Sequence, residues 1–224
     1  MKLALPMLRS AIVGLLVFGV LVFGPAGTVK YWRGWVFILV FATCTNIIGL
    51  YLAQNDPALL ERRMKVGPGA ETRPAQKAII SLALLAFATL FVVSVLDYRF
   101  GWSTVPAAVS IVGDILVALG LIVDLRVFGE NSYGASTIET AAGQTVISTG
   151  PYALVRHPMY VGVLILLLGV PLALGSYWGE LFMFVNLPIL MLRIRDEETM
   201  LKQELKGYID YMQHVRYRLL PGLW

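Results

Sequence analysis

Long apolar segments separated by shorter polar connections make up most of this 224-residue chain. Six segments stand out, at Met7–Gly24, Trp35–Ala53, Ala78–Leu96, Val105–Leu125, Tyr160–Leu174 and Tyr177–Leu192. The first four are long enough to cross the hydrocarbon core of a bilayer, which takes about 20 helical residues. The last two are shorter, adjoin through Gly175 and Ser176, and each contain a proline, so we expect a kinked helical hairpin. The pattern predicts an all-α, polytopic membrane protein with about six transmembrane helices.

The stretch after the hairpin has the periodicity of an amphipathic helix. Its apolar residues recur on one helical face, at Leu201, Leu205, Tyr208, Ile209 and Met212. Charged residues such as Lys202 and Glu204 fall on the other faces. We expect a cytoplasmic C-terminal helix that lies along the membrane interface, caps the candidate site at the end of the hairpin and ends at Pro221 and Gly222.

The composition supports lipid as the solvent of the apolar segments. Hydrophobic residues make up 58% of the chain and charged residues only 14%, whereas soluble domains carry about 25% charged residues. The single cysteine, Cys44, excludes an intrachain disulfide, and with only two histidines in the chain it argues against a structural zinc site.

The positive charges predict the orientation in the membrane. With a cytoplasmic N-terminus, 15 of the 18 Lys and Arg residues fall on the cytoplasmic side, and only Lys30, Arg33 and Arg99 fall outside. This distribution requires an even number of crossings and places both termini in the cytoplasm. The connection Gln54–Lys77 then lies on the cytoplasmic side, and we interpret its charged run Glu61–Lys65 as a solvated or headgroup-facing surface. The alternative is that this run takes part in gating the access of the substrate.

Two parts of one integrated membrane domain follow from this pattern. Residues 1–126 form a four-helix membrane region, and residues 127–224 hold a connector, the hairpin and the C-terminal helix. The connector Val127–Val155 is too polar to span a membrane and too rich in Tyr, Val and Ile to be disordered. Loops of this kind are often functional, and the backbone NH and CO groups of this one could serve a polar cofactor.

Two acids lie in or near the fourth apolar segment. Asp114 is in its middle, where an acid costs about 3 kcal/mol and needs a partner or a water-filled cavity. It is either a pocket wall or substrate-sensing group, or a hydrogen-bonded acid that joins helices. Asp124 lies near the cytoplasmic end of the segment, and we expect it to form an interfacial ion pair with Arg126.

The run Arg156-His157-Pro158-Met159-Tyr160 carries the first candidate chemistry. Pro158 disfavours a helical conformation at His157 and suits the first turn of a helix, so a helix should start here at the membrane interface. The free NH groups of such a start bind a carboxylate or another anion, and Tyr160 could stack on a planar base. Taken alone, the run is also compatible with an ordinary interfacial helix start.

A second polar cluster, Arg193–Glu198, lies where the hairpin leaves the membrane. Arg193 and Glu197 are four positions apart, on one helical face. Alone, this cluster is compatible with a salt-bridged helix exit. Because the hairpin returns it to the side of His157, we expect the two clusters to form one shared site.

The C-terminal motifs together resemble the core of a known family. They are Gly150-Pro151-Tyr152, Arg156-His157-Pro158-x-Tyr160-x-Gly162, Arg193 followed by Glu197-Glu198, Gly207-Tyr208-x-x-Tyr211, and Arg216-x-Arg218-Leu219-x-Pro221. In this order they resemble the isoprenylcysteine carboxyl methyltransferase family, whose core the related phospholipid methyltransferases share. The resemblance covers roughly the last 95 residues.

The resemblance implies that S-adenosylmethionine is the cofactor, bound on the cytoplasmic side without a Rossmann fold and without a metal. The implied cofactor contacts are Gln144, Thr145, Val146, Ile147, Tyr152, His157, Pro158, Met159, Tyr160 and Glu197. Arg193 is implied to face the methyl acceptor as the catalytic, orienting residue. Arg156, Glu198, Asn131 and Asp114 are additional candidates.

The function that we predict is methyl transfer to a lipophilic acceptor drawn from the bilayer, with membrane lipids and no nucleic acid as partners. Carboxyl O-methylation of a prenylcysteine-like acceptor needs no base, because a carboxylate is already ionised at pH 7. Arg193 could orient it by a bidentate contact. One alternative is N-methylation of a phosphatidylethanolamine-type lipid, which would need a base such as Glu198 or Asp196. Another is a non-catalytic membrane transporter or scaffold, which Asp114 and the kinked hairpin would suit.

Overall fold

The computed structural model describes residues 3–224, and over this range every regular element is a helix. The helices are α1 (Ala4–Ala26), α2 (Trp32–Asn55), α3 (Pro57–Met64), α4 (Pro74–Phe100), α5 (Ala107–Glu130), the 3₁₀ helix η1 (Gly150–Ala153), α6 (Pro158–Ala173), α7 (Trp178–Leu181), α8 (Met183–Glu204) and α9 (Tyr208–His214). Four of them, α1, α2, α4 and α5, are long and apolar enough to cross a membrane. The predicted all-α polytopic membrane fold is confirmed.

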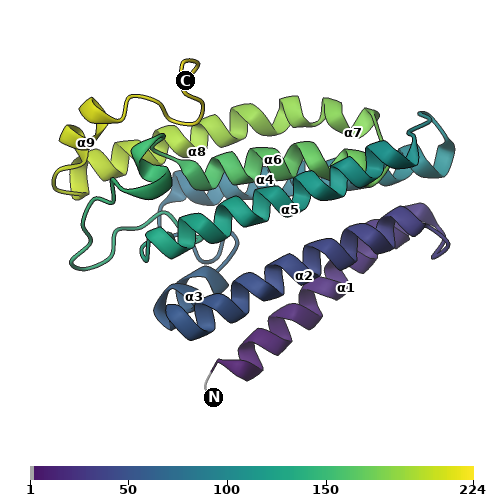
Figure 1. Ribbon diagram of the computed structural model, residues 1–224, viewed down its shortest axis with the longest axis horizontal. Coiled ribbons are helices and arrows are strands. Elements are labelled where there is room, and N and C mark those ends of the chain that lie inside the picture. Colours follow the sequence, from purple (N-terminus) through teal and green to yellow (C-terminus); the bar gives the residue numbers. More distant parts are fainter. Residues whose placement is uncertain (1–2) are drawn as a thin grey trace.

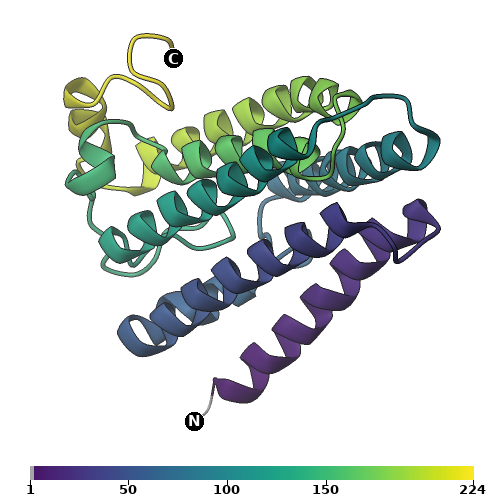
Figure 2. The same cartoon turned by 45° about the vertical axis from the view of Figure 1, so that its right-hand side comes forward.

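The long helices run side by side, so that the connections gather at two ends (Figure 1). One end carries α3, α9, η1 and the start of α1, and we call it the polar end; the opposite end carries α7. Helix α1 packs on α2 and α4, and α2 packs on α5. Figure 2 shows α1 and α2 diverging towards the polar end. Only Val22 and Ala26 of α1 are buried, as expected of a helix that faces lipid.

Helices α5 and α6 form the most intimate pair because glycines let their backbones touch. A Cβ atom at Gly120 would lie 2.6 Å from the carbonyl oxygen of Gly162, and one at Gly169 would lie 2.7 Å from the carbonyl oxygen of Gly113. A Cβ at Gly113 would collide with the backbone of Leu172 and Ala173. Any larger side chain at these positions would push the two helices apart.

The predicted hairpin consists of α6, the short α7 and α8. The buried carboxylate of Asp97 in α4 holds the turn between α6 and α7, because it accepts a hydrogen bond of 2.6 Å from the Ser176 hydroxyl in that turn. The same carboxylate accepts a hydrogen bond of 2.7 Å from the NH group of Ser103, in the loop between α4 and α5. Helix α8 runs on past its apolar part to Glu204, so that its last turns project from the bundle at the polar end. The polar cluster that begins at Arg193 therefore lies on this projecting part.

The C-terminal amphipathic helix is not continuous, contrary to the prediction. Helix α8 ends at Glu204, the chain turns at Gly207 with a φ of +86°, and α9 then ends at His214 rather than at Pro221. The break has a local cause, since glycine adopts the left-handed conformation at little cost. Beyond α9 the chain turns back, and the carbonyl oxygens of Tyr217 and Arg218 accept hydrogen bonds from the Arg156 and His157 NH groups.

Candidate functional site

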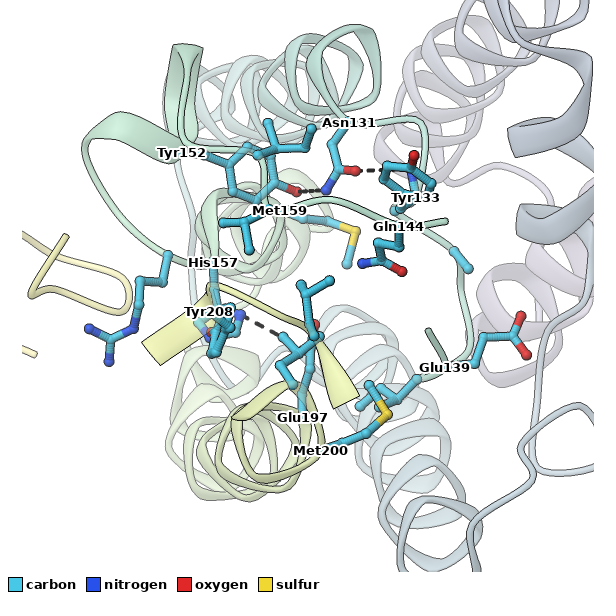
Figure 3. Close-up of a pocket in the computed structure, with 18 of the residues that line it drawn as sticks. Asn131, Tyr133, Glu139, Gln144, Tyr152, His157, Met159, Glu197, Met200 and Tyr208 are labelled. Carbon is cyan, nitrogen blue, oxygen red and sulfur yellow. Dashed lines mark hydrogen bonds and ion pairs between the residues drawn. The ribbon is translucent and has the colours of Figure 1, made fainter. Parts of the chain in front are cut away.

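A cleft opens at the polar end, between residues 131–149 of the connector, the start of α6, the projecting part of α8, and α9. Its empty volume, including the open mouth, is about 830 Å³. Figure 3 shows Asn131, Tyr133 and Tyr152 on one side of it, and His157, Glu197 and Tyr208 on the other.

Most of the residues predicted for the site line this cleft. They are Asn131, Gln144, Thr145, Val146, Ile147, Tyr152, Arg156, His157, Met159, Tyr160, Arg193 and Glu197. Pro158, Glu198 and Asp114 do not line it. Pro158 instead forms the first residue of α6, with His157 before it in a non-helical conformation, as the sequence predicted.

Several residues that were not among the predicted site residues complete the walls. Tyr133, Met200, Leu201, Leu205, Tyr208 and Tyr211 also line the cleft. The helical periodicity at Leu201, Leu205 and Tyr208 is the signal for three of them, since the helix that it predicts is expected to cap the site. In the structure Leu201 and Leu205 lie at the end of α8, and the break at Gly207 brings Tyr208 of α9 back to the cleft.

Glu198 forms a buried cluster behind the cleft. Its side chain is 1% exposed and makes ion pairs of 2.8 Å with both Arg156 and Arg218. The Nε2 atom of His157 lies 3.3 Å from the same carboxylate. Burial alone would raise the pKa of Glu198, but the hydrogen bonds from His157, Arg218 and Arg156 outweigh it and lower the pKa to about 2. Glu198 is therefore ionised and fully engaged, and does not face the cleft as a base.

Glu197, the next residue, faces the cleft. Its Oε2 atom accepts a hydrogen bond of 2.7 Å from the Tyr160 hydroxyl and lies 4.0 Å from the Nδ1 atom of His157. Its side chain is 23% exposed, and no arginine pairs with it among the described residues. Its carboxylate is therefore available to a cationic group in the cleft.

Arg193 lines the cleft, but protein groups surround its guanidinium. Its Nη1 atom donates to Glu71 at 3.1 Å and to Gln76 at 3.0 Å. Its Nη2 atom donates to the carbonyl oxygen of Ser136 at 2.9 Å, and its Nε atom donates to the Tyr160 hydroxyl at 3.2 Å. The arrangement leaves no free pair of donors for the bidentate acceptor contact that the sequence suggested.

Asp196, the other base suggested for N-methylation, is also engaged. It forms an ion pair of 3.1 Å with Arg73 and accepts a hydrogen bond from the side chain of Gln76. Both partners lie at the start of α4, so the ion pair ties α4 to α8 beside the cleft. Neither Asp196 nor Glu198 is free to accept a proton from a bound amine.

The aromatic wall is held by hydrogen bonds and remains neutral. The Asn131 amide donates to the Tyr152 hydroxyl at 2.7 Å, and the Tyr211 hydroxyl donates to the Tyr152 carbonyl oxygen at 2.7 Å. Burial raises the pKa of Tyr152 to about 12 and also raises the pKa values of Tyr208 and Tyr211. The buried hydroxyl of Tyr208 has no hydrogen-bond partner within residues 3–224. It is thus a polar atom that a ligand could satisfy.

The segment Gln144–Ile147 forms the outer wall of the cleft. It follows a turn at Gly143, where φ is +74°, and the Gln144 side chain accepts a hydrogen bond of 2.9 Å from the Ala141 NH group. No hydrogen bond in the described part of the chain uses the NH groups of Thr145, Val146 or Ile147. These groups are available to a polar ligand.

The two aspartates of α5 lie outside the cleft. Asp124 does not pair with Arg126 as predicted: Asp124 is buried against Gly162, whereas Arg126 is exposed. The reason is helical geometry, since residues two positions apart point to different faces. Asp114 is 5% exposed, and neither carboxylate oxygen has a partner within the described residues. It therefore joins no helices by a hydrogen bond, and it does not contribute to the cleft.

Comparisons with known proteins give matches to part of the chain. Residues 108–206 match the Phospholipid methyltransferase family. A segment of 94 residues is 32% identical to the Delta(14)-sterol reductase TM7SF2 of Mus musculus, covering 41% of this chain and 22% of the reductase. The match thus spans about a fifth of that relative's length. The matched region 108–206 includes α5 through α8 and most of the cleft, so this part of the molecule is a phospholipid-methyltransferase-like membrane region.

Proposed function

We propose that the protein is an integral membrane methyltransferase that uses S-adenosylmethionine to methylate a lipophilic acceptor. The observation that carries the proposal is the Glu197 carboxylate, which faces a cleft lined by aromatic side chains and free backbone NH groups within a phospholipid-methyltransferase-like region. When bound, S-adenosylmethionine supplies an electrophilic methyl group on a positively charged sulfur. The task of the protein is then to position the two reactants.

The residues of the cleft fit this cofactor. Glu197 would hold the ammonium group through a charge-assisted hydrogen bond. The free NH groups of 145–147, together with the positive end of the α6 helix dipole, would receive the carboxylate. Tyr152 and Tyr208 would stack on or bond to the adenosine part, which would also satisfy the unpartnered Tyr208 hydroxyl.

The charge of the cleft favours a cationic cofactor over a dinucleotide, the class of hydride donor that a reductase needs. Arg156 is neutralised by Glu198 and Arg193 by Glu71. The unpaired Glu197 carboxylate would repel the negative charges of a dinucleotide diphosphate, whereas it suits a sulfonium or ammonium ion. The cleft therefore fits methyl transfer better than the reductase activity in the name of the mouse relative.

For the acceptor, we propose a prenylcysteine-like carboxylate. Both acids that might deprotonate an amine, Glu198 and Asp196, are held in ion pairs, and a carboxylate needs no base. The second candidate is N-methylation of a phosphatidylethanolamine-type lipid, which the match to the Phospholipid methyltransferase family favours. In either case we propose that the polar end faces the cytoplasm, so that cofactor and lipid reach the cleft from different phases.

Calorimetry on the purified protein with S-adenosylmethionine tests the cofactor. We expect saturable binding that Glu197→Ala abolishes and that Asp210→Ala, which removes an exposed acid on α9, leaves intact. Absence of binding to the wild type would support a transporter or scaffold, and binding of a nicotinamide dinucleotide in its place would support a reductase.

Methyl-labelled cofactor then distinguishes the acceptors. The protein is incubated with either a prenylcysteine analogue or phosphatidylethanolamine vesicles. Base-labile, volatile label from the prenylcysteine analogue supports carboxyl methylation. Base-stable label in the lipid would show N-methylation and overturn the carboxyl proposal.

A further inference from the structure

A buried acid from the N-terminal half of the chain reaches the cleft. Glu71 lies in the loop between α3 and α4 and is 3% exposed. Its Oε1 atom pairs with Nη1 of Arg193 at 3.1 Å, across 122 positions of sequence. It lies outside residues 108–206, the region that matches a family, so the comparison does not account for it.

A continuous chain of hydrogen bonds links this acid to the cleft. Arg193 donates through Nε to the Tyr160 hydroxyl at 3.2 Å, and that hydroxyl donates to Oε2 of Glu197 at 2.7 Å. The hydroxyl thus accepts one hydrogen bond and donates the other, which is the full use of its single proton. The positions of the Glu197 carboxylate and of Glu71 are coupled through two side chains.

Glu71 also holds the opposite wall of the cleft. Its second oxygen, Oε2, accepts a hydrogen bond of 3.1 Å from the NH group of Ile138 in the connector. One carboxylate therefore fixes both α8, through Arg193, and the connector 131–149, through Ile138. Glutamine at this position could serve only one of the two, because an amide has a single acceptor oxygen.

We infer that Glu71 is a positioning residue of the cleft, which holds the Glu197 carboxylate in place through Arg193 and Tyr160. The inference rests on the proposed function for the identity of the ligand. Without the negative charge of Glu71, the nearest carboxylate for the Arg193 guanidinium is Glu197, four positions along the same helical face. Arg193 would then leave the Tyr160 hydroxyl, and Tyr160 would no longer hold the Glu197 carboxylate in its position in the cleft.

The first measurement is affinity for S-adenosylmethionine, by calorimetry on the full chain in detergent. We expect Glu71→Gln to weaken binding about tenfold, the size of one charge-assisted hydrogen bond. Glu61→Gln is the matched control: it makes the same charge change in the exposed part of α3 nearby and should leave affinity unchanged. Unchanged affinity in Glu71→Gln would overturn the inference.

A double-mutant cycle separates positioning from a general loss of structure. Tyr160→Phe breaks the chain at its middle while keeping the Glu71–Arg193 ion pair. If Glu71 acts through Tyr160, the double variant should bind no more weakly than Tyr160→Phe alone. Additive losses would show that Glu71 and Tyr160 affect binding independently of each other, and would contradict the inference.

Hydrogen exchange without any ligand keeps the two proposals distinguishable. We expect Glu71→Ala, which removes both contacts, to raise exchange in the connector 131–149 about tenfold relative to Glu61→Gln. If the wild type does not bind S-adenosylmethionine, the proposed function fails, and unchanged exchange in Glu71→Ala would then overturn the positioning role as well.

Discussion

Glu197 and Glu198 are neighbours in sequence, yet they lie in opposite surroundings. Glu198 is enclosed by Arg156, His157 and Arg218 and has no contact with the cleft. Glu197 points into the cleft and has one hydrogen bond, from Tyr160. One helical step of about 100° separates the two side chains. The comparison shows how α8 divides its polar residues between a face that holds the fold together and a face that is open to a ligand.

The largest expected effect is on stability, from Glu198→Ala. Removing this carboxylate leaves the buried Arg156 guanidinium, which is 4% exposed, without its partner. Breaking a buried ion pair in this way costs about 3–5 kcal/mol. Unfolding by denaturant titration in detergent measures it, with Glu204→Ala as the exposed control. A loss below about 1 kcal/mol, typical of surface pairs, would contradict the buried-cluster interpretation.

The pH dependence of stability gives a second test of the role of Glu198. Because the pKa of Glu198 is lowered from 4.5 to about 2 in the folded protein, its contribution is complete above the unfolded value of 4.5. It is lost as the pH falls from 4.5 towards 2. We expect wild-type stability to decline over this window and the difference between wild type and Glu198→Gln to shrink with it. A difference that stays constant down to pH 2 would show that the charge of Glu198 is not responsible.

Glu197→Gln should show the opposite behaviour, with an effect on binding and little on stability. Loss of one charge-assisted hydrogen bond weakens S-adenosylmethionine binding about 10- to 100-fold, or about 1.5–3 kcal/mol. The free energy of unfolding should stay within about 0.5 kcal/mol of the wild type, as for a surface substitution. Calorimetry and denaturant titration on the same sample test both. A variant that unfolds easily and binds normally would reverse the assignment of the two acids.

The smallest effect is expected for Arg218→Ala. Its side chain is 27% exposed, and after its removal Glu198 keeps Arg156 and His157. We expect a loss of about 1 kcal/mol or less, as for a partly solvated ion pair. The same denaturant titration measures it beside Arg156→Ala, which should cost clearly more. Equal losses would mean that the two arginines share the buried charge evenly.

Much of the fold followed from the apolar pattern, because spans in a bilayer must be long, helical and apolar. The approach of His157 to Arg193 also followed, since a hairpin returns its two ends to one side. The break at Gly207 did not follow, because a single glycine decides between a continued helix and a turn. Which of Glu197 and Glu198 faces the cleft depends on the rotation of α8, which its neighbours set.

The contact of Glu71 with the site could not be predicted from the sequence, for a related reason. Its contact with Arg193 joins loop and helix across 122 positions, and it depends on how α4 packs against α8. In the sequence, Glu71 is one acid in the connection Gln54–Lys77, outside the charged run Glu61–Lys65, and no motif singles it out. The unpaired Asp124 shows the same difficulty, since its separation from Arg126 results from burial on one face of α5.

The glycine contacts between α5 and α6 have a consequence for how this molecule can change. These contacts hold the two ends of the connector at a fixed separation, independently of the connector's own residues. Insertions or substitutions within 131–149 therefore leave the membrane packing undisturbed while they reshape one wall of the cleft. Exchange of this loop between related proteins is accordingly the simplest route to altered ligand preference on the same transmembrane frame.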